Sequence, residues 1–164
     1  MKRLLTLSCA LALASPLFAQ QPNVQVQPPD LHGSRQLEKQ TGPAVVRDYI
    51  ESWQKMSAAL NQNQPALLNA DFVGSAREKL AATIKTQSQI GIHSRYLGSS
   101  HNLQIVFYSP EGQSIQLIDH VEYDEQVLNQ DKVLATQHMK ARYIVVLTPA
   151  ETRWKVRIFQ ASPE

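Results

Sequence analysis

The sequence predicts an α+β fold in which N-terminal helices pack on one face of an antiparallel sheet of about four strands. Apolar residues recur with the period of a helix between residues 42 and 90, and with a period of two after Ser100. The connections between the later segments are short and rich in turn residues. Helices followed by closely connected strands are typical of an antiparallel meander covered on one side.

The first 19 residues read as an export signal. Lys2 and Arg3 precede an apolar stretch over residues 4–14, which is shorter than the ~20 residues that a membrane-spanning helix requires. Cleavage is expected after Ala19, which predicts a periplasmic or secreted protein without a transmembrane anchor. Cys9 lies inside this segment, and Thr6 stands where a lipoprotein signal would carry leucine, so a discarded cysteine is the favoured interpretation.

Charge and composition exclude several classes of function. The chain has 16 Lys and Arg against 14 Asp and Glu, and removing Lys2 and Arg3 leaves no net charge. A neutral domain lacks the basic excess of a nucleic-acid-binding protein. Without Cys9 there is no thiol or disulfide chemistry. The sequence has no phosphate-binding or dinucleotide-binding glycine pattern, so no cofactor is expected.

Residues 20–41 are rich in Gln and Pro and are expected to form a flexible leader. One domain is predicted over residues 42–160, followed by a short tail over 161–164. Its first helix has Pro43 in the first turn. The second is expected to begin with a capping box at Ser75 and Glu78. The apolar stripe of the first helix consists of Val46, Tyr49, Ile50, Trp53, Met56 and Leu60.

Four strands are expected over residues 101–108, 114–128, 133–147 and 152–160, while 92–100 is either a loop or a short strand. Strand alternation sorts the segment "IDHVEYDEQ" (118–126) into two faces. The inward face is expected to carry Ile115, Leu117, Asp119, Val121, Tyr123, Glu125 and Val127, with Trp154, Val156 and Ile158 on the last strand.

The outward face is expected to carry the remaining charged side chains of this segment. Pairing about the turn at residues 129–132 places Glu122 near His138, His120 near Lys140 and Asp124 near Thr136. Mixed charges on adjacent strands are typical of a solvated sheet face. The weaker alternative is a metal site with His120, His138 and Glu122 as ligands.

Several apolar side chains are also expected on the outward face. They require a second cover, either another subunit or the leader folded back through Val24, Val26 and Leu31; a homodimer through the sheet is preferred. These side chains are Val106, Ile118, Ile144, Val146 and Phe159.

Asp119 is the residue most able to carry chemistry. It stands on the apolar face between Leu117 and Val121 and near Tyr143. A carboxylate there suits a general base or a ligand-orienting group. The alternative is a carboxylate near the edge of the sheet that reaches water or a helix N-terminus.

The layout of residues 42–160 resembles the nuclear transport factor 2-like superfamily, which includes SnoaL-like and polyketide-cyclase-like proteins. The resemblance rests on the helix that carries Trp53, on the break "NQPALLNADFVGSAREKL", and on the closing "ARYIVVLTPAETRWKVRIFQ". It implies a cystatin-like cone, with a pocket between a curved sheet and the helices. The family's extra strand is not evident, which leaves the strand number open. The side chains that would line the pocket are Tyr49, Trp53, Met56, Tyr123, Met139 and Tyr143.

Two functions follow from this resemblance. The first is a non-catalytic exported domain that binds a small apolar ligand or an envelope protein, as a homodimer. The second is a cofactor-free isomerase, cyclase or hydratase that uses Asp119 as the general base, with Tyr123 or Tyr143 as the electrophile. An enclosed cavity at Asp119 with a tyrosine hydroxyl in reach would favour the enzyme.

Overall fold

The computed structural model describes residues 22–162. The predicted signal segment and residues 163–164 of the predicted tail lie outside the described residues. Within 22–162, none of the helices combines the length and the apolar character that crossing a bilayer requires.

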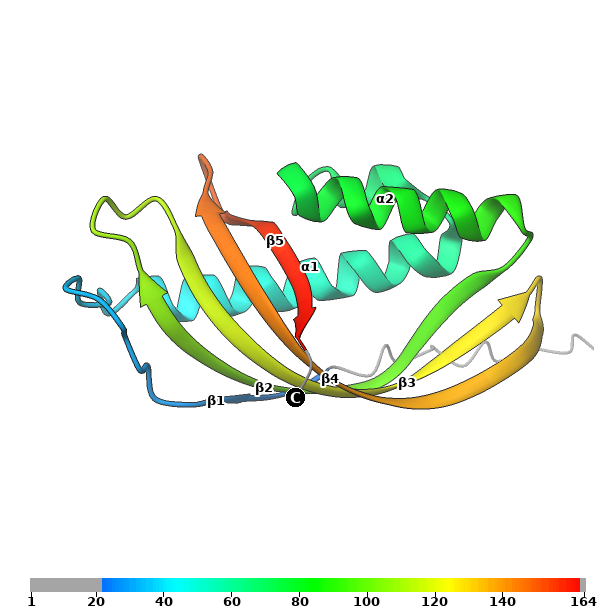
Figure 1. The fold of residues 1–164 in the computed structure, drawn as a ribbon, viewed down its shortest axis with the longest axis horizontal. Coiled ribbons are helices and arrows are strands. Elements are labelled where there is room, and N and C mark those ends of the chain that lie inside the picture. The colour runs from blue at the N-terminus through cyan, green and yellow to red at the C-terminus, as the bar shows by residue number, and fades with distance from the viewer. Residues whose placement is uncertain (1–21, 163–164) are drawn as a thin grey trace, which may run out of the picture.

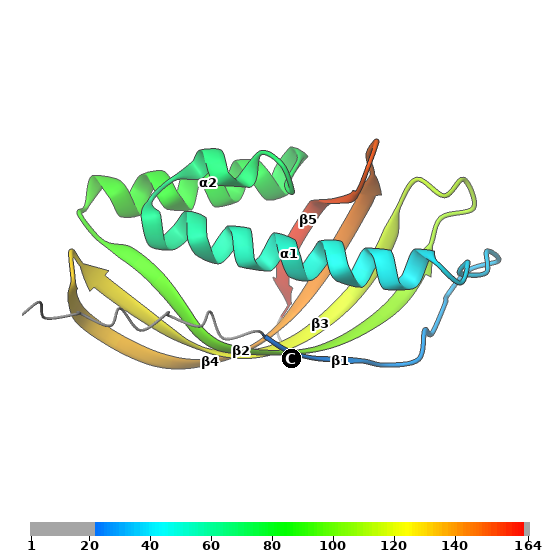
Figure 2. The ribbon, with the colours of Figure 1, turned by 180° about the vertical axis from the view of Figure 1, so that it is seen from behind.

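Two helices lie across the concave side of one curved, five-stranded sheet (Figure 1), and the reverse view shows the same two layers (Figure 2). The strands follow one another in the order β1-β2-β3-β4-β5, and all neighbours except β1 and β2 are antiparallel. The predicted α+β class is confirmed, with one strand more than expected. The elements are β1 (Asn23–Val26), α1 (Thr41–Gln62), the 3-10 turn η1 (Pro65–Leu68), α2 (Gly74–Gln89), β2 (His93–Tyr108), β3 (Ile115–Asn129), β4 (Lys132–Pro149) and β5 (Trp154–Ser162).

Helix α1 supplies the centre of the core, while α2 covers the sheet near β5. Neither helix has a side-chain cap at its start. Gln40 precedes α1 without a side-chain cap, and Val73 precedes α2 likewise. The predicted capping box at Ser75 is wrong because α2 already begins at Gly74, and the Ser75 hydroxyl donates instead to the carbonyl of Arg157.

The predicted alternation of β3 is confirmed over residues 119–123, because Asp119 and Tyr123 are buried whereas His120 and Glu122 are exposed; near the bulge it is not followed, since Val127 is partly buried and Leu128 is buried. The register against β4 differs from the expected one by two residues. Asp119 faces Tyr143, and Glu122 faces Lys140. Part of the difference comes from a bulge, since β4 has an additional residue opposite the Val127–Leu128 step. A difference of two residues leaves the two faces unchanged.

A second bulge reverses the faces of β5. Val146 pairs with Ile158 whereas Leu147 pairs with Val156, so Arg157 is an extra residue. Beyond it, Phe159 stacks on Tyr143 with ring centroids 4.4 Å apart, and Ile158 is 39% exposed. The predictions that Ile158 points inward and Phe159 outward are therefore wrong.

Residues 92–100, left open by the sequence, form the first half of β2. The strand bends where its register against β3 breaks between Leu97 and Ser100, and Gly98 has a φ of +63° at this bend. After the bend, His101, Leu103 and Ile105 are all buried on the inward face.

The leader joins the fold instead of standing apart from it. β1 pairs in parallel with residues 100–103 of β2, and Gln27, Asp30 and His32 donate their backbone N–H groups to carbonyls of β2. Val24 and Leu31 pack against the core, as the folded-back alternative predicts, but at the edge of the sheet.

Arg35 fastens the leader to the turn after β2. Its guanidinium donates to the carbonyl of Pro110 (2.7 Å) and to Glu38 (2.6 Å), and it lies 4.3 Å from the centre of the Tyr108 ring. The hydrogen bond from Arg35, reinforced by the Thr41 hydroxyl, lowers the pKa of Glu38 from 4.5 to about 2.

The contacts of Glu38 are expected to make the free energy of unfolding depend on pH. Because the pKa of Glu38 is lower in the folded state, its contribution is present above pH 4.5 and is lost as the pH falls towards 2. We expect Glu38→Gln to be less stable than the wild type at pH 6, and the two urea unfolding curves to converge between pH 4 and pH 2. A difference that stays constant over this range would contradict the assignment.

Candidate functional site

Asp119, Tyr49 and His101 form a buried polar cluster at the centre of the core. The Tyr49 hydroxyl donates to Asp119 Oδ2 (2.6 Å), and His101 Nδ1 lies 2.8 Å from the same oxygen. The carboxylate is fully buried, and the other two residues are 1% exposed. The cluster therefore joins α1, β2 and β3 through one carboxylate oxygen.

The positions of these residues follow from the local structure. Tyr49 lies on the buried stripe of α1, Asp119 lies on the inward face of β3, and His101 follows the bend of β2. Burial, followed by the neighbouring carboxylate, raises the pKa of Tyr49 well above its usual value. The phenol is therefore a neutral hydrogen-bond donor over the physiological pH range.

Two atoms of the cluster have no hydrogen-bond partner in the described part of the chain. They are Asp119 Oδ1 and His101 Nε2, both inaccessible to solvent. An unpaired buried polar atom costs about 1 to 3 kcal/mol, so proteins retain few of them.

Aromatic rings close the space beside the cluster. Trp53 packs edge-on against His101 with centroids 4.8 Å apart, and against Tyr123 at 5.5 Å and Tyr143 at 5.9 Å. The Trp53 indole N–H donates to the Ser99 hydroxyl (3.1 Å). Burial raises the pKa of Tyr123 and that of Tyr143.

The structure brings the sequence-predicted pocket residues together, but as packed core. Tyr49, Trp53, Met56 and Tyr123 are at most 3% exposed, while Met139 and Tyr143 are partly buried. Tyr49 is the tyrosine within reach of Asp119. Binding and catalytic roles for these residues stay predictions.

Several cavities lie around this core, including one of about 200 Å³ whose lining contains His101 and His120. A groove of about 510 Å³ opens between the leader, the start of α1 and β2. A cavity of about 300 Å³ with a mixed polar and apolar lining is bordered by Trp53, Tyr96 and Ser99. The residues that line the groove of about 510 Å³, here named the leader groove, are Val26, Gln27, Pro29, Leu37, Gly42, Pro43, Val46, Arg47 and Ile105.

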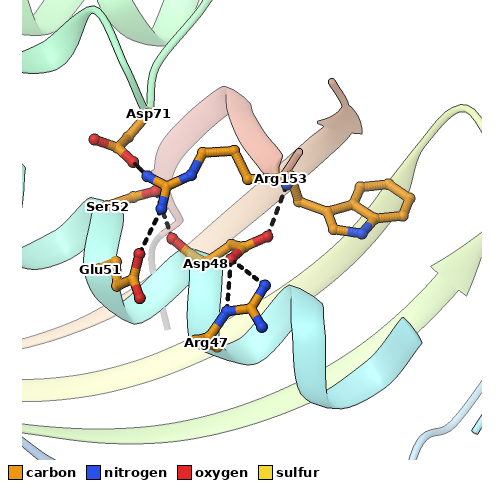
Figure 3. A network of polar contacts seen from close by, with 7 residues as sticks. Arg47, Asp48, Glu51, Ser52, Asp71 and Arg153 are labelled. Carbon is orange, nitrogen blue, oxygen red and sulfur yellow. Dashed lines mark hydrogen bonds and ion pairs between the residues drawn. The ribbon is translucent and has the colours of Figure 1, made fainter. Parts of the chain in front are cut away.

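An ionic network ties α1 to the turn before β5 (Figure 3). Arg153 pairs with Asp71 and with Glu51, the latter at 2.7 Å. Asp48 accepts the backbone N–H of Trp154 (2.8 Å) and pairs with Arg47 (2.8 Å). The network holds the β4–β5 turn against the helix layer.

The weak metal candidates lie on the outward face of the sheet, where His138 Nε2 lies 3.8 Å from Glu122 Oε2, as the predicted pairing of these two residues implies, but their closest partners are other side chains. Glu122 binds Lys140 at 2.8 Å, His138 binds Asp124 at 2.8 Å, and His120 faces Arg142. Over residues 22–162, no group of three His, Cys, Asp or Glu side chains is arranged to hold a metal ion. The predicted pairing of mixed charges across these strands is confirmed in kind, with the shifted register.

Sequence reasoning missed His101. The signal was present, because His101 shares the alternation of Leu103 and Ile105 and therefore belongs to the inward face. The strand predicted over residues 101–108 contains this alternation, but inward and outward faces were assigned only to the later strands. Ser99, the partner of Trp53, was missed because residues 92–100 were left open.

No family model and no curated protein matches the sequence. Among solved structures, the intermembrane space region of the chloroplast protein ARC6 is similar, with a TM-score of 0.60 and 15% identity over 79% of this chain and 100% of that one. A putative scytalone dehydratase from Novosphingobium aromaticivorans gives a TM-score of 0.49 and 16% identity over 77% of this chain and 89% of that one. At such identities a likeness shows the fold alone. The chain has the nuclear transport factor 2-like fold, as its sequence resemblance implies.

Proposed function

We propose that this protein is a non-catalytic exported domain that binds a small apolar molecule in the leader groove. The observation that carries the proposal is the chemistry of that groove. Its volume of about 510 Å³ lies within the usual range of ligand sites, and its walls are mainly aliphatic. Val26, 54% exposed, adds an accessible aliphatic side chain to one wall of the groove.

The two polar side chains at the groove are already engaged. Arg47 pairs with Asp48 at 2.8 Å, and the Gln27 amide donates to Asn102 at 2.9 Å. Apart from these two side chains the lining is apolar, which favours an apolar ligand over a polar one. Gly42 shapes the floor, because a Cβ there would lie 3.1 Å from the Leu37 side chain.

The burial of the cluster at Asp119 favours a binding function over a catalytic one. Asp119, Tyr49 and His101 are sealed by Trp53 and the neighbouring rings, so a substrate has no path to the carboxylate in this conformation. The leader groove, by contrast, is open. Export is proposed from residues 1–19, and an envelope protein is the alternative partner for such a domain.

The test is the binding of N-phenyl-1-naphthylamine, a neutral apolar dye whose fluorescence rises on burial. We expect saturable binding of one dye per chain. Val46→Trp fills the groove and should raise the Kd at least tenfold, because the aliphatic wall is then occupied. Ile90→Trp is the matched control, since Ile90 is 64% exposed and stands at the end of α2.

Unsaturable dye binding, or equal loss in the Val46 and Ile90 variants, would contradict the groove assignment. Mass spectrometry of the natively purified protein would then identify any molecule that co-purifies. A protein co-purifying in place of a small molecule would favour the envelope partner.

A second candidate function is favoured by the unpaired Asp119 Oδ1 and His101 Nε2. Rotation of Trp53 away from His101 would expose a carboxylate, an imidazole and a phenol to the neighbouring cavity of about 300 Å³. That arrangement suits an isomerase, cyclase or hydratase with Asp119 as the proton acceptor. Deuterium uptake from D2O into a β,γ-unsaturated cyclic ketone, lost in Asp119→Asn, would support it. No uptake by the wild type over a panel of such ketones would count against it.

A further inference from the structure

The distal half of the β3–β4 hairpin has a long strand edge that no second strand covers in the described part of the chain. β5 pairs with β4 only from Arg142 onward. Residues 132–138 of β4 are exposed throughout, including Val133 at 44% and Leu134 at 53%. Within residues 22–162, the backbone of 135–139 makes hydrogen bonds to β3 and to no other segment. A row of unpaired N–H and C=O groups is a template for another strand.

The edges at β1 and β5 are shortened or partly covered, and the edge of β2 over residues 93–99, which also lacks a second strand among the described residues, is interrupted by the bend at Gly98. β1 has four residues and is followed by Pro28 and Pro29. β5 is covered where Val73 donates its N–H to the Val156 carbonyl and Val156 donates to Asp71. Proteins commonly shorten or cover edges in these ways to prevent association. The bare edge of β4 therefore stands out as a surface that another strand can use.

We propose that this edge pairs with the same edge of a second copy, antiparallel and about a two-fold axis at Gln137. In an antiparallel pair of strands, residues that lie opposite each other point to the same face of the sheet. A two-fold axis between two copies of one strand must therefore place one residue opposite its own copy. An axis at Gln137 places Ala135 opposite Met139 and Thr136 opposite His138, all within the regular part of β4.

Neighbouring registers are less favourable. An axis at Thr136 places Lys132 opposite Lys140 and draws the bulge near Leu134 into the ladder. An axis at Met139 places His138 opposite Lys140 and runs into the β5 pairing at Arg142. Like charges directly opposite each other destabilise a sheet pair. If the pairing is confined to residues 135–139, the Gln137 register avoids both conflicts and puts the apolar pair Ala135 and Met139 on the concave face.

This interface differs from the sheet-face homodimer that the sequence suggests. Of the apolar residues expected on the outward face, Ile118 is 8% exposed, and Val106, Ile144 and Val146 are partly buried. Phe159 has turned inward. Ile158, at 39%, is the exposed apolar residue that the bulge adds to this face. The other apolar residues of the outward face are largely covered, whereas the β4 edge leaves backbone groups unpaired, so we place the second copy at the edge. The proposal is independent of the ligand proposed above.

The test is sedimentation equilibrium over a concentration series, with two matched variants. Ala135→Lys should raise the dimer dissociation constant at least tenfold, because it puts a charge opposite Met139. Ile158→Lys changes the outward face of the sheet and should leave dimerisation unchanged. Dimer loss in Ile158→Lys alone, or a wild type that stays monomeric at millimolar concentration, would overturn the proposal.

Disulfide trapping tests the register by the formation of a covalent dimer instead of by the loss of dimerisation. In a Cys9→Ser background, Gln137→Cys should cross-link under mild oxidation, because the two side chains meet at the axis. Thr136→Cys, equally exposed and one residue away, should cross-link at least tenfold more slowly. Equal rates, or a faster Thr136→Cys, would overturn the register.

Discussion

Asp119→Ala is expected to cost about 3 to 5 kcal/mol of unfolding free energy, because it removes the shared acceptor of two buried groups. The Tyr49 hydroxyl and His101 Nδ1 both contact Asp119 Oδ2, and neither side chain reaches solvent. Truncation leaves a phenol and an imidazole buried without this partner. Urea unfolding followed by tryptophan fluorescence measures the effect, since Trp53 lies against His101.

Asp124→Ala is the matched control for this prediction. Asp124 lies on the same strand and also contacts a histidine at 2.8 Å, but its side chain is 53% exposed. We expect a cost of less than about 1 kcal/mol there, because an exposed pair gains little. Similar costs for Asp119→Ala and Asp124→Ala would show that burial does not govern the cluster.

The triple variant Asp119→Leu, Tyr49→Phe, His101→Leu separates polar from packing contributions. Replacing a whole buried polar group by apolar residues of similar volume is often nearly neutral. We therefore expect it to be more stable than Asp119→Ala. If this apolar variant still binds the dye in the leader groove, the cluster serves stability and not ligand binding.

The inward placement of Asp119 could be predicted because β3 alternates without interruption from Ile115 to Tyr123. A period of two specifies both faces of a strand from local sequence alone. The register could not be predicted, since the bulges near Leu134 and at Arg157 involve no glycine or proline that would mark them. The bulge at Arg157 alone accounts for the exchanged faces of Ile158 and Phe159.

The leader strand was missed for a different reason. Asn23–Val26 pairs with residues 77 positions later, as in Asn23 with Ser100, and no local signal reports so distant a partner. The surrounding Gln and Pro residues are typical of a linker. Because one wall of the leader groove belongs to this segment, the groove itself could not be inferred from the sequence.

Arg153→Met is expected to cost about 3 kcal/mol, because it leaves Asp71 as a buried carboxylate without its partner. Asp71 is 1% exposed, and its Oδ2 already has no partner within the described chain. The pair with Glu51 adds less, since Glu51 is 42% exposed. Urea unfolding of the variant at neutral pH measures this cost.

Arg47→Met provides the contrast that makes the Arg153 result interpretable. Asp48 is equally buried at 1%, yet it retains the backbone N–H of Trp154 when Arg47 is removed, and the Arg47 side chain is 60% exposed. The expected cost is therefore about 1 kcal/mol. In Arg153→Met, a second change of Asp71→Leu should recover most of the loss, because no buried charge then remains. A cost for Arg153→Met no larger than that for Arg47→Met would mean that the start of β5 is held by the backbone bonds of Val156 to Asp71 and Val73 rather than by this ion pair.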